Sequence, residues 1–74
     1  MQVTVKLFAT FREGRFVSEV REYPERTSIA SVIKQLAIDP AEIGMIMVNG
    51  RHADPVDLLN DGANLALFPL LGGG

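Results

Sequence analysis

The chain has 74 residues, of which 47% are hydrophobic and 22% charged, and its formal net charge is −2. This composition suits one small domain with a hydrophobic core, whereas a disordered chain has lower hydrophobicity and a larger net charge. The sequence has no cysteine, which excludes disulfides, thiolate nucleophiles and cysteine-based zinc sites, and its one histidine, His52, does not make a metal site alone. The charge forms no basic stripe, so we expect no nucleic-acid partner.

The sequence also gives little support for a membrane protein or a stand-alone enzyme. No apolar run of the sequence approaches the roughly 18 residues of a membrane-spanning helix. Residues 1–6 lack the basic start and long apolar stretch of a signal peptide. We therefore expect a cytoplasmic protein with no membrane partner. The glycines stand singly until the last three residues, so there is no phosphate-binding loop, and a stand-alone enzyme is a poor hypothesis.

The first part of the chain predicts a β-hairpin. Over residues 2–9 apolar side chains alternate with polar ones, a period of two that is typical of a half-buried strand, and Phe8 breaks the polar phase. Residues 12–15 are a polar turn, and residues 16–22 return as a second, more weakly patterned strand. Tyr23-Pro24 ends that strand, because proline cannot donate to a ladder. The residues expected to face the core from the first strand are Val3, Val5 and Leu7.

A single main helix follows, from about residue 29 to residue 37. Ser28 is a good N-cap, because its hydroxyl can accept from an unpaired backbone N–H. Asp39-Pro40 is expected to stop the helix, since the residue before a proline disfavours the α region. The apolar stripe has helical spacing and consists of Ile29, Val32, Ile33 and Leu36.

Short strands complete the predicted domain. Residues 45–48 are an apolar run closed by Asn49-Gly50, a strong hairpin signal, and residues 51–53 are the return strand. A turn at Asp54-Pro55 leads to residues 56–59, which we interpret as one helical turn. A last strand covers residues 64–68, and Pro69 ends the fold.

The element order predicts an α+β architecture. It is a mixed four- to five-stranded sheet with one main helix packed on one face, because a helix of this length allows a crossover connection. Hairpin, helix, strands and final strand is the order of the β-grasp, or ubiquitin-like, fold. Residues 1–69 would form this domain, and residues 70–74 a flexible glycine tail.

At this point the chain resembles the MoaD/ThiS family of ubiquitin-like sulfur carriers. The resemblance spans the chain in order, and its ordered pieces are Val5–Ala9, Phe11–Glu13, the helix, Val48–Gly50, Asp61-Gly62, Ala66–Pro69 and the terminal glycines. The first strand and Phe11–Glu13 are more similar to the molybdopterin branch than to the thiamine branch. The family pattern ends in two glycines, whereas this chain ends in three.

The resemblance implies a protein cosubstrate, or the small subunit of a synthase complex, and not an enzyme. A ubiquitin-activating-like partner would use ATP to adenylate the terminal carboxylate, and a sulfur donor would convert the adenylate to a thiocarboxylate. The thiocarboxylate would deliver sulfur at a synthase large subunit or a thiazole synthase. No cofactor is expected to bind the chain itself. Gly74 would carry the reacting group, and Gly72 and Gly73 would provide reach because glycine has no Cβ.

The glycine tail leaves two alternatives open. The three glycines could be a frayed terminus or the remnant of a linker, since termini are usually disordered. The third glycine could also belong to a precursor that is trimmed, in which case Gly73 becomes the acting end.

One face of the predicted sheet is a candidate partner-binding surface. If Val3, Val5 and Leu7 face the helix, Phe8 faces away from it, and the same alternation points Met45 and Met47 outward. Exposed aromatic and methionine side chains on a small domain often mark a protein interface. The alternative is that these long side chains fold over to complete the core. The candidate partner-binding residues are Phe8, Met47, Ala66, Phe68 and Pro69.

Other charged residues are weaker candidates. Arg51 and His52 flank a tight turn and are expected to be solvated, and Arg12 and Arg15 belong to a charged turn that could meet an acidic partner. Asp54, Asp57 and Asp61 lack the spacing of a calcium loop and are interpreted as turn and cap residues.

Three functions remain open on the sequence. They are a sulfur carrier, a ubiquitin-like modifier joined through its C-terminal glycine to a lysine, and a binding domain with an inert tail. The sequence does not separate the molybdopterin, tungstopterin, thiazole and amino-acid pathways, nor does it indicate an oligomeric state.

Overall fold

The computed structural model describes residues 1–71. Five strands, one α-helix and two short 3₁₀ helices make up this part of the chain. In chain order these elements are β1 (Gln2–Leu7), η1 (Ala9–Arg12), β2 (Ser18–Glu22), α1 (Ile29–Gln35), η2 (Pro40–Glu42), β3 (Ile43–Val48), β4 (Arg51–His52) and β5 (Ala63–Pro69).

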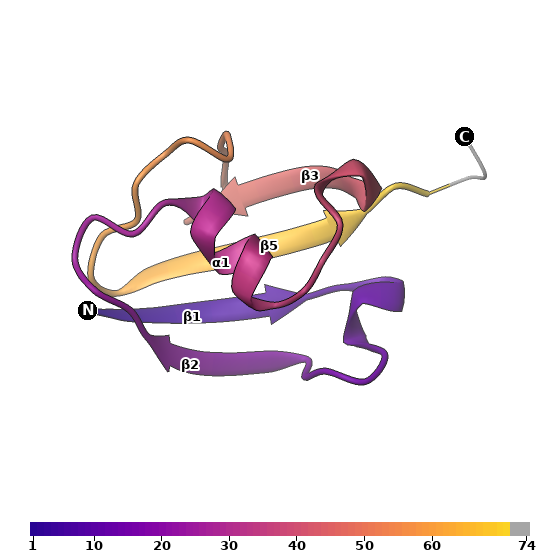
Figure 1. The fold of residues 1–74 in the computed structure, drawn as a ribbon, viewed down its shortest axis with the longest axis horizontal. Coiled ribbons are helices and arrows are strands. Elements are labelled where there is room, and N and C mark those ends of the chain that lie inside the picture. Colours follow the sequence, from indigo (N-terminus) through magenta and orange to yellow (C-terminus); the bar gives the residue numbers. More distant parts are fainter. Residues whose placement is uncertain (72–74) are drawn as a thin grey trace.

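The strands form one mixed sheet in the order β2-β1-β5-β3-β4. β1 and β5 run parallel at its centre, and the pairs β1–β2, β3–β5 and β3–β4 are antiparallel. Helix α1 crosses one face of the sheet, and the chain leaves β5 at the end of the sheet opposite to the N-terminus (Figure 1). This arrangement is the β-grasp fold, so the predicted mixed sheet with one main helix is confirmed.

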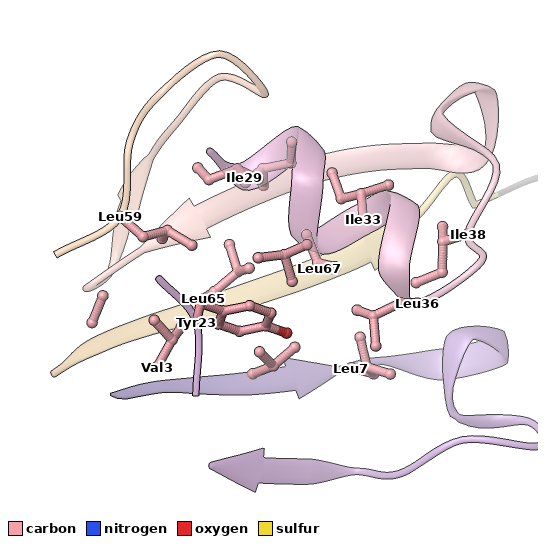
Figure 2. Close-up of a cluster of buried hydrophobic side chains, with 14 of the residues drawn as sticks. Val3, Leu7, Tyr23, Ile29, Ile33, Leu36, Ile38, Leu59, Leu65 and Leu67 are labelled. Carbon is pink, nitrogen blue, oxygen red and sulfur yellow. The ribbon is translucent and has the colours of Figure 1, made fainter. Parts of the chain in front are cut away.

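The core lies between α1 and the sheet, and we call the face of the sheet that α1 covers the inner face. Figure 2 shows side chains of α1 pointing toward those of β1 and β5. The inward positions of the two central strands are buried, with Val3, Val5, Leu65 and Leu67 at 0% exposure, whereas Val48 of β3 is only partly buried against the core. The predicted stripe of the helix is buried in full and consists of Ile29, Val32, Ile33 and Leu36. The period-two and helical patterns therefore place the core correctly.

Helix α1 begins where predicted and ends earlier. The Ser28 hydroxyl accepts a hydrogen bond from the Ser31 N–H at 3.2 Å, as expected of an N-cap. The helix stops at Gln35, because Ala37 takes a left-handed conformation with φ 56°. The Arg15 guanidinium donates to the carbonyl oxygens of Leu36 and Ala37 at 3.0 and 3.1 Å, which stabilises this end. No helix within residues 1–71 is both long and apolar enough to cross a membrane.

The first hairpin differs from its prediction at the turn. The chain enters η1 directly after Phe8, and Phe11 is buried at 3% exposure, so the turn begins before the polar residues 12–15. β2 begins at Ser18 instead of Phe16. Phe16 precedes β2 and packs against the core, with the Arg21 guanidinium carbon 5.5 Å from the centre of its ring.

The second half of the chain contains two further corrections. Residues 56–59 do not form a helical turn, because the carbonyl groups of Pro55 and Asp57 accept the first N–H groups of α1, from Ala30 and Ile29. The last strand is one residue longer at each end than the predicted range 64–68, because β5 runs from Ala63 to Pro69, and Pro69 pairs with Ile43. A proline is tolerated there because its missing N–H is not needed by the ladder.

Candidate functional site

The outer face of the sheet, opposite to α1, carries the predicted partner-binding residues. Residues that are directly opposite in neighbouring strands point to the same face of a sheet. Met47 is opposite Ala66, and Met45 is opposite Phe68. These four side chains therefore share the outer face, over the part of β3 and β5 where the chain leaves the sheet.

Phe8 completes this group by stacking on Phe68. The two rings have centroids 4.2 Å apart and an interplanar angle of 12°. Phe8 follows β1 with extended dihedral angles, φ −120° and ψ 152°, and its N–H donates to the carbonyl oxygen of Leu67 at 3.2 Å. The backbone thus holds Phe8 beside β5 for one residue beyond β1. Such a stacked pair contributes about 0.5–1.5 kcal/mol beyond its buried area.

We call the five residues Phe8, Met45, Met47, Ala66 and Phe68 the outer cluster. All five are partly buried, and all lie outside the core cluster of buried residues. The side chains cover one another on the outer face and do not complete the core on the inner face. This arrangement removes the alternative that Phe8 and Phe68 fold over into the core. The role of the outer cluster in binding a partner stays a prediction.

Arg12 extends the outer cluster with a positive charge. Its Nε donates to the carbonyl oxygen of Leu7 at 2.8 Å, and its guanidinium carbon lies 5.5 Å from the centre of the Phe8 ring. A guanidinium at this distance from an aromatic ring is attracted to it by the ring quadrupole. The charge of Arg12 is therefore held at the rim of an apolar surface, where an acidic partner group could meet it.

The tail begins beside the outer cluster. Pro69 is buried, unlike the other predicted partner-binding residues, so its side chain is not offered to a partner. The N–H of Leu70, the residue after β5, donates to the carbonyl oxygen of Glu42 in η2 at 2.8 Å. Leu70 and Leu71 are 62% and 76% exposed. The predicted acting residues, Gly72, Gly73 and Gly74, lie outside the described residues.

The aspartates that a calcium loop would need serve as caps. The Asp57 carboxylate accepts from the N–H of Asp54 at 2.9 Å, and the Asp61 carboxylate accepts from the N–H of Gln2 at 2.7 Å. Arg51 and His52, both exposed, form β4. Within residues 1–71 no group of three or more histidine or acidic side chains is placed to hold a metal ion.

Sequence reasoning missed two parts of this site. Met45 was placed on the outer face by alternation but was not counted among the partner-binding residues, although it lies two residues before Met47 and shares its phase. The contact between Arg12 and Phe8 depends on η1, which the sequence did not reveal.

A five-stranded mixed sheet with one helix in this order is the β-grasp fold of ubiquitin-like proteins, and its last strand leads into the exposed residues Leu70 and Leu71. Residues 5–74 match the ThiS family, and the chain belongs to that family. The predicted resemblance to the MoaD/ThiS carriers is thereby confirmed. The family match extends through the three terminal glycines. A search of curated proteins gave no significant match.

Several solved structures have the same fold as this chain. A putative molybdopterin converting factor subunit 1 from Pyrococcus furiosus has 27% identity and a TM-score of 0.78, over 96% of this chain and 99% of that one. SAMP1 from Haloferax volcanii, a small archaeal modifier protein, has 22% identity and a TM-score of 0.78 over the whole of both chains. A complex of subunits 1 and 2 of the molybdopterin-converting factor from Helicobacter pylori matches with 19% identity and a TM-score of 0.67, again over both whole chains.

Proposed function

We propose that the chain is a sulfur carrier whose working group is the carboxylate of its glycine tail. A carboxylate oxygen attacks the α-phosphate of ATP in a partner enzyme, and pyrophosphate leaves. A sulfur donor then displaces AMP from the acyl-adenylate and leaves a thiocarboxylate. The observation that carries this proposal is the family match, which runs through Gly74. The chain itself is a protein cosubstrate in the cytoplasm, and ATP is bound by its partner.

The tail's covalent structure supports this chemistry. Among residues 1–71, Leu70 is the last with a backbone hydrogen bond to the domain, and Leu71 and the three glycines follow it in the sequence. Four extended residues span at most about 14 Å. The partner's nucleotide must therefore lie within that distance of Leu70, and residues without a Cβ allow foreign backbone to approach closely.

The outer cluster is the proposed docking surface for the activating enzyme and for the sulfur acceptor. Aromatic and methionine side chains are enriched in protein interfaces. Phe68 precedes Leu70 by two residues, so a partner bound to the outer cluster already lies at the base of the tail. Docking there would raise the local concentration of the carboxylate at the partner's active site.

Molybdopterin-type biosynthesis is the favoured pathway. The Pyrococcus furiosus protein at 27% identity is named as a putative subunit 1 of the molybdopterin converting factor. The Helicobacter pylori subunit 1 is in a complex with subunit 2. We propose a corresponding large subunit as the partner that consumes the thiocarboxylate, for molybdopterin or its tungsten counterpart, while a thiazole synthase is the partner that the ThiS family name suggests.

A protein modifier is the second candidate, and the likeness to SAMP1 favours it. The two functions share adenylation and differ in the acceptor, which is sulfur for a carrier and a lysine amine for a modifier. Intact-mass spectrometry of the chain from cells separates them. A carrier gains the mass difference of one sulfur replacing one oxygen, whereas a modifier appears in much larger conjugates.

The tail is tested by deletion. We expect removal of Gly73 and Gly74 to abolish ATP–pyrophosphate exchange with the cognate activating enzyme while the melting temperature stays unchanged, because the core lies within residues 3–67. Removal of Gly74 alone assigns the acting end: full exchange activity points to Gly73, and lost activity points to Gly74. A chain without Gly72, Gly73 and Gly74 that still accepts sulfur would contradict the carrier function and favour a binding domain.

A further inference from the structure

Gly44 lies in β3 where the pairing with β5 is irregular. The register shifts between Ile43 and Met45, and Gly44 is the extra residue of this bulge. A Cβ at Gly44 would lie 2.9 Å from the carbonyl oxygen of Pro69 and 3.1 Å from both the Cα and the N of Leu70. Those atoms belong to the backbone, so they cannot rotate away as the end of a flexible side chain could.

The conformation of Gly44 itself does not require glycine. Gly50 has a φ of 80°, a left-handed conformation that favours glycine, and a Cβ added there would meet no atom within 4 Å. Glycine is therefore required at Gly50 by its backbone conformation and not by lack of space. Gly44 has no left-handed φ. The reason at Gly44 is instead the close approach of another backbone segment, and that segment is the base of the tail.

Three contacts hold the base of the tail at this point. Pro69 pairs with Ile43, the Leu70 N–H donates to the Glu42 carbonyl oxygen at 2.8 Å, and the backbone of Leu70 lies against Gly44. Glu42 ends η2, whose start is capped by the Asp39 carboxylate accepting from the Ala41 N–H at 2.9 Å. Pro69 and Leu70 thus pack on the segment from η2 to Gly44.

We propose that Gly44 is a positioning residue that fixes where the tail leaves the sheet relative to the outer cluster. Gly44 adjoins Met45 of the outer cluster along β3 and contacts Leu70 of the tail across the sheet, so it links the docking surface to the tail. This inference rests on the proposed function. A partner that binds the outer cluster and accepts the tail at once requires a fixed offset between them, and a displacement on the order of 1 Å can cost about a hundredfold in rate.

The test is Gly44→Ala, measured by amide hydrogen exchange and by kinetics with the cognate activating enzyme. We expect faster hydrogen exchange at the Leu70 amide, because the added methyl separates Leu70 from Glu42. We also expect kcat for ATP–pyrophosphate exchange to fall by about tenfold, less than the hundredfold that a displacement on the order of 1 Å can cost when it is fully transmitted to the reacting group. KM for the carrier should stay unchanged, because the outer cluster is intact.

The matched control is Gly50→Ala, at the other end of β3. It makes the same chemical change at a left-handed position, so it lowers the melting temperature without touching the tail. Its kcat and its Leu70 hydrogen exchange should equal those of the wild type. A kcat in Gly50→Ala as low as in Gly44→Ala would show that lost stability, and not the tail position, controls the rate.

A second pair of variants tests the hydrogen bond between Leu70 and Glu42 without altering β3. Leu70→Pro removes the N–H that donates to Glu42, whereas Leu70→Ala keeps it and removes the same exposed side chain. We expect kcat to fall in Leu70→Pro relative to Leu70→Ala. This pair decides the proposal if Gly44→Ala does not fold.

The outcomes separate the inference from the proposed function. A wild-type chain that supports no exchange at all overturns the proposed function and, with it, the role of Gly44. An active wild type with a Gly44→Ala variant of equal kcat, or with unchanged Leu70 hydrogen exchange, overturns the inference alone.

Discussion

The two faces of the sheet are built from the same strands but from different side chains. On the inner face Val5, Leu65 and Leu67 are fully buried beneath α1. On the outer face Phe8 and Phe68 stack on each other and remain partly exposed. The inner face needs a cover to be stable in water, and α1 provides it within the chain. The apolar region of the outer face, the outer cluster, has no helix over it within residues 1–71.

This difference indicates how a function can be recognised in so small a domain. Polar side chains occupy the outer positions of β1, at Gln2, Thr4 and Lys6, as is usual for a solvent-facing side. The apolar side chains of the outer face, those of the outer cluster, lie at the end of the sheet where the chain leaves β5. Apolar residues in the polar phase of a strand are therefore the informative ones, since the buried phase reports only the core.

The largest effect is expected from the inner face. Ile33, on the buried side of α1 at 2% exposure, packs against the inner face, and Ile33→Ala should lower the free energy of unfolding by about 2–5 kcal/mol. That is a large part of the roughly 5–15 kcal/mol that stabilises a typical domain. Urea denaturation measures it. A loss below about 1 kcal/mol, the level of an ordinary substitution, would mean that the inner face is not the main core.

A smaller effect of a different kind is expected from the outer face. Phe68→Ala should weaken binding to the activating enzyme by about 1–3 kcal/mol, as measured by calorimetry. Its cost in stability should be about 1 kcal/mol, because it loses the stack with Phe8. Val20→Ala is the matched control, since Val20 is also on the outer face, is 61% exposed and lies outside the outer cluster. If Phe68→Ala leaves binding intact but unfolds the domain, the outer cluster is a second core and not a docking surface.

The smallest effect is expected at the rim of the outer cluster. Arg12→Met keeps an unbranched apolar stem and removes the guanidinium and its charge, so the contact with Phe8 should weaken by about 0.5–1 kcal/mol. If Arg12 meets an acidic group of the partner, the association rate should fall at low salt and become less dependent on salt. Stopped-flow measurements at two ionic strengths test this. Equal salt dependence in the wild type and the variant would exclude Arg12 from the encounter.

The sequence predicted the layers of the fold because their causes are local. Alternation identified Val3, Val5 and Leu7, helical spacing identified the stripe of α1, and Asn49-Gly50 marked the tight turn. Asn49 and Gly50 have φ values of 52° and 80°, the left-handed pair that such a hairpin requires. Each of these signals depends on a few neighbouring residues only.

The parts that the sequence did not predict depend on contacts between distant segments. Helix α1 ends before Asp39-Pro40 partly because Arg15, more than 20 residues away, binds its last carbonyl groups. Residues 56–59 do not become helical because nearby carbonyl groups are used by the first turn of α1. The close approach of Gly44 to Leu70 likewise follows from the pairing of β3 with β5, which no local pattern encodes.

The central position of β5 has a consequence for how the protein is made. β5 lies between β1 and β3, and both of these strands precede it in the chain. During translation the middle of the sheet therefore stays open until residues 63–69 have emerged from the ribosome, and the parallel pair of β1 and β5 closes a loop of nearly the whole domain. Such long-range pairing slows folding. The nascent chain consequently exposes its unpaired strands until residues 63–69 are available, and the glycine tail follows directly after the strand that allows the domain to fold.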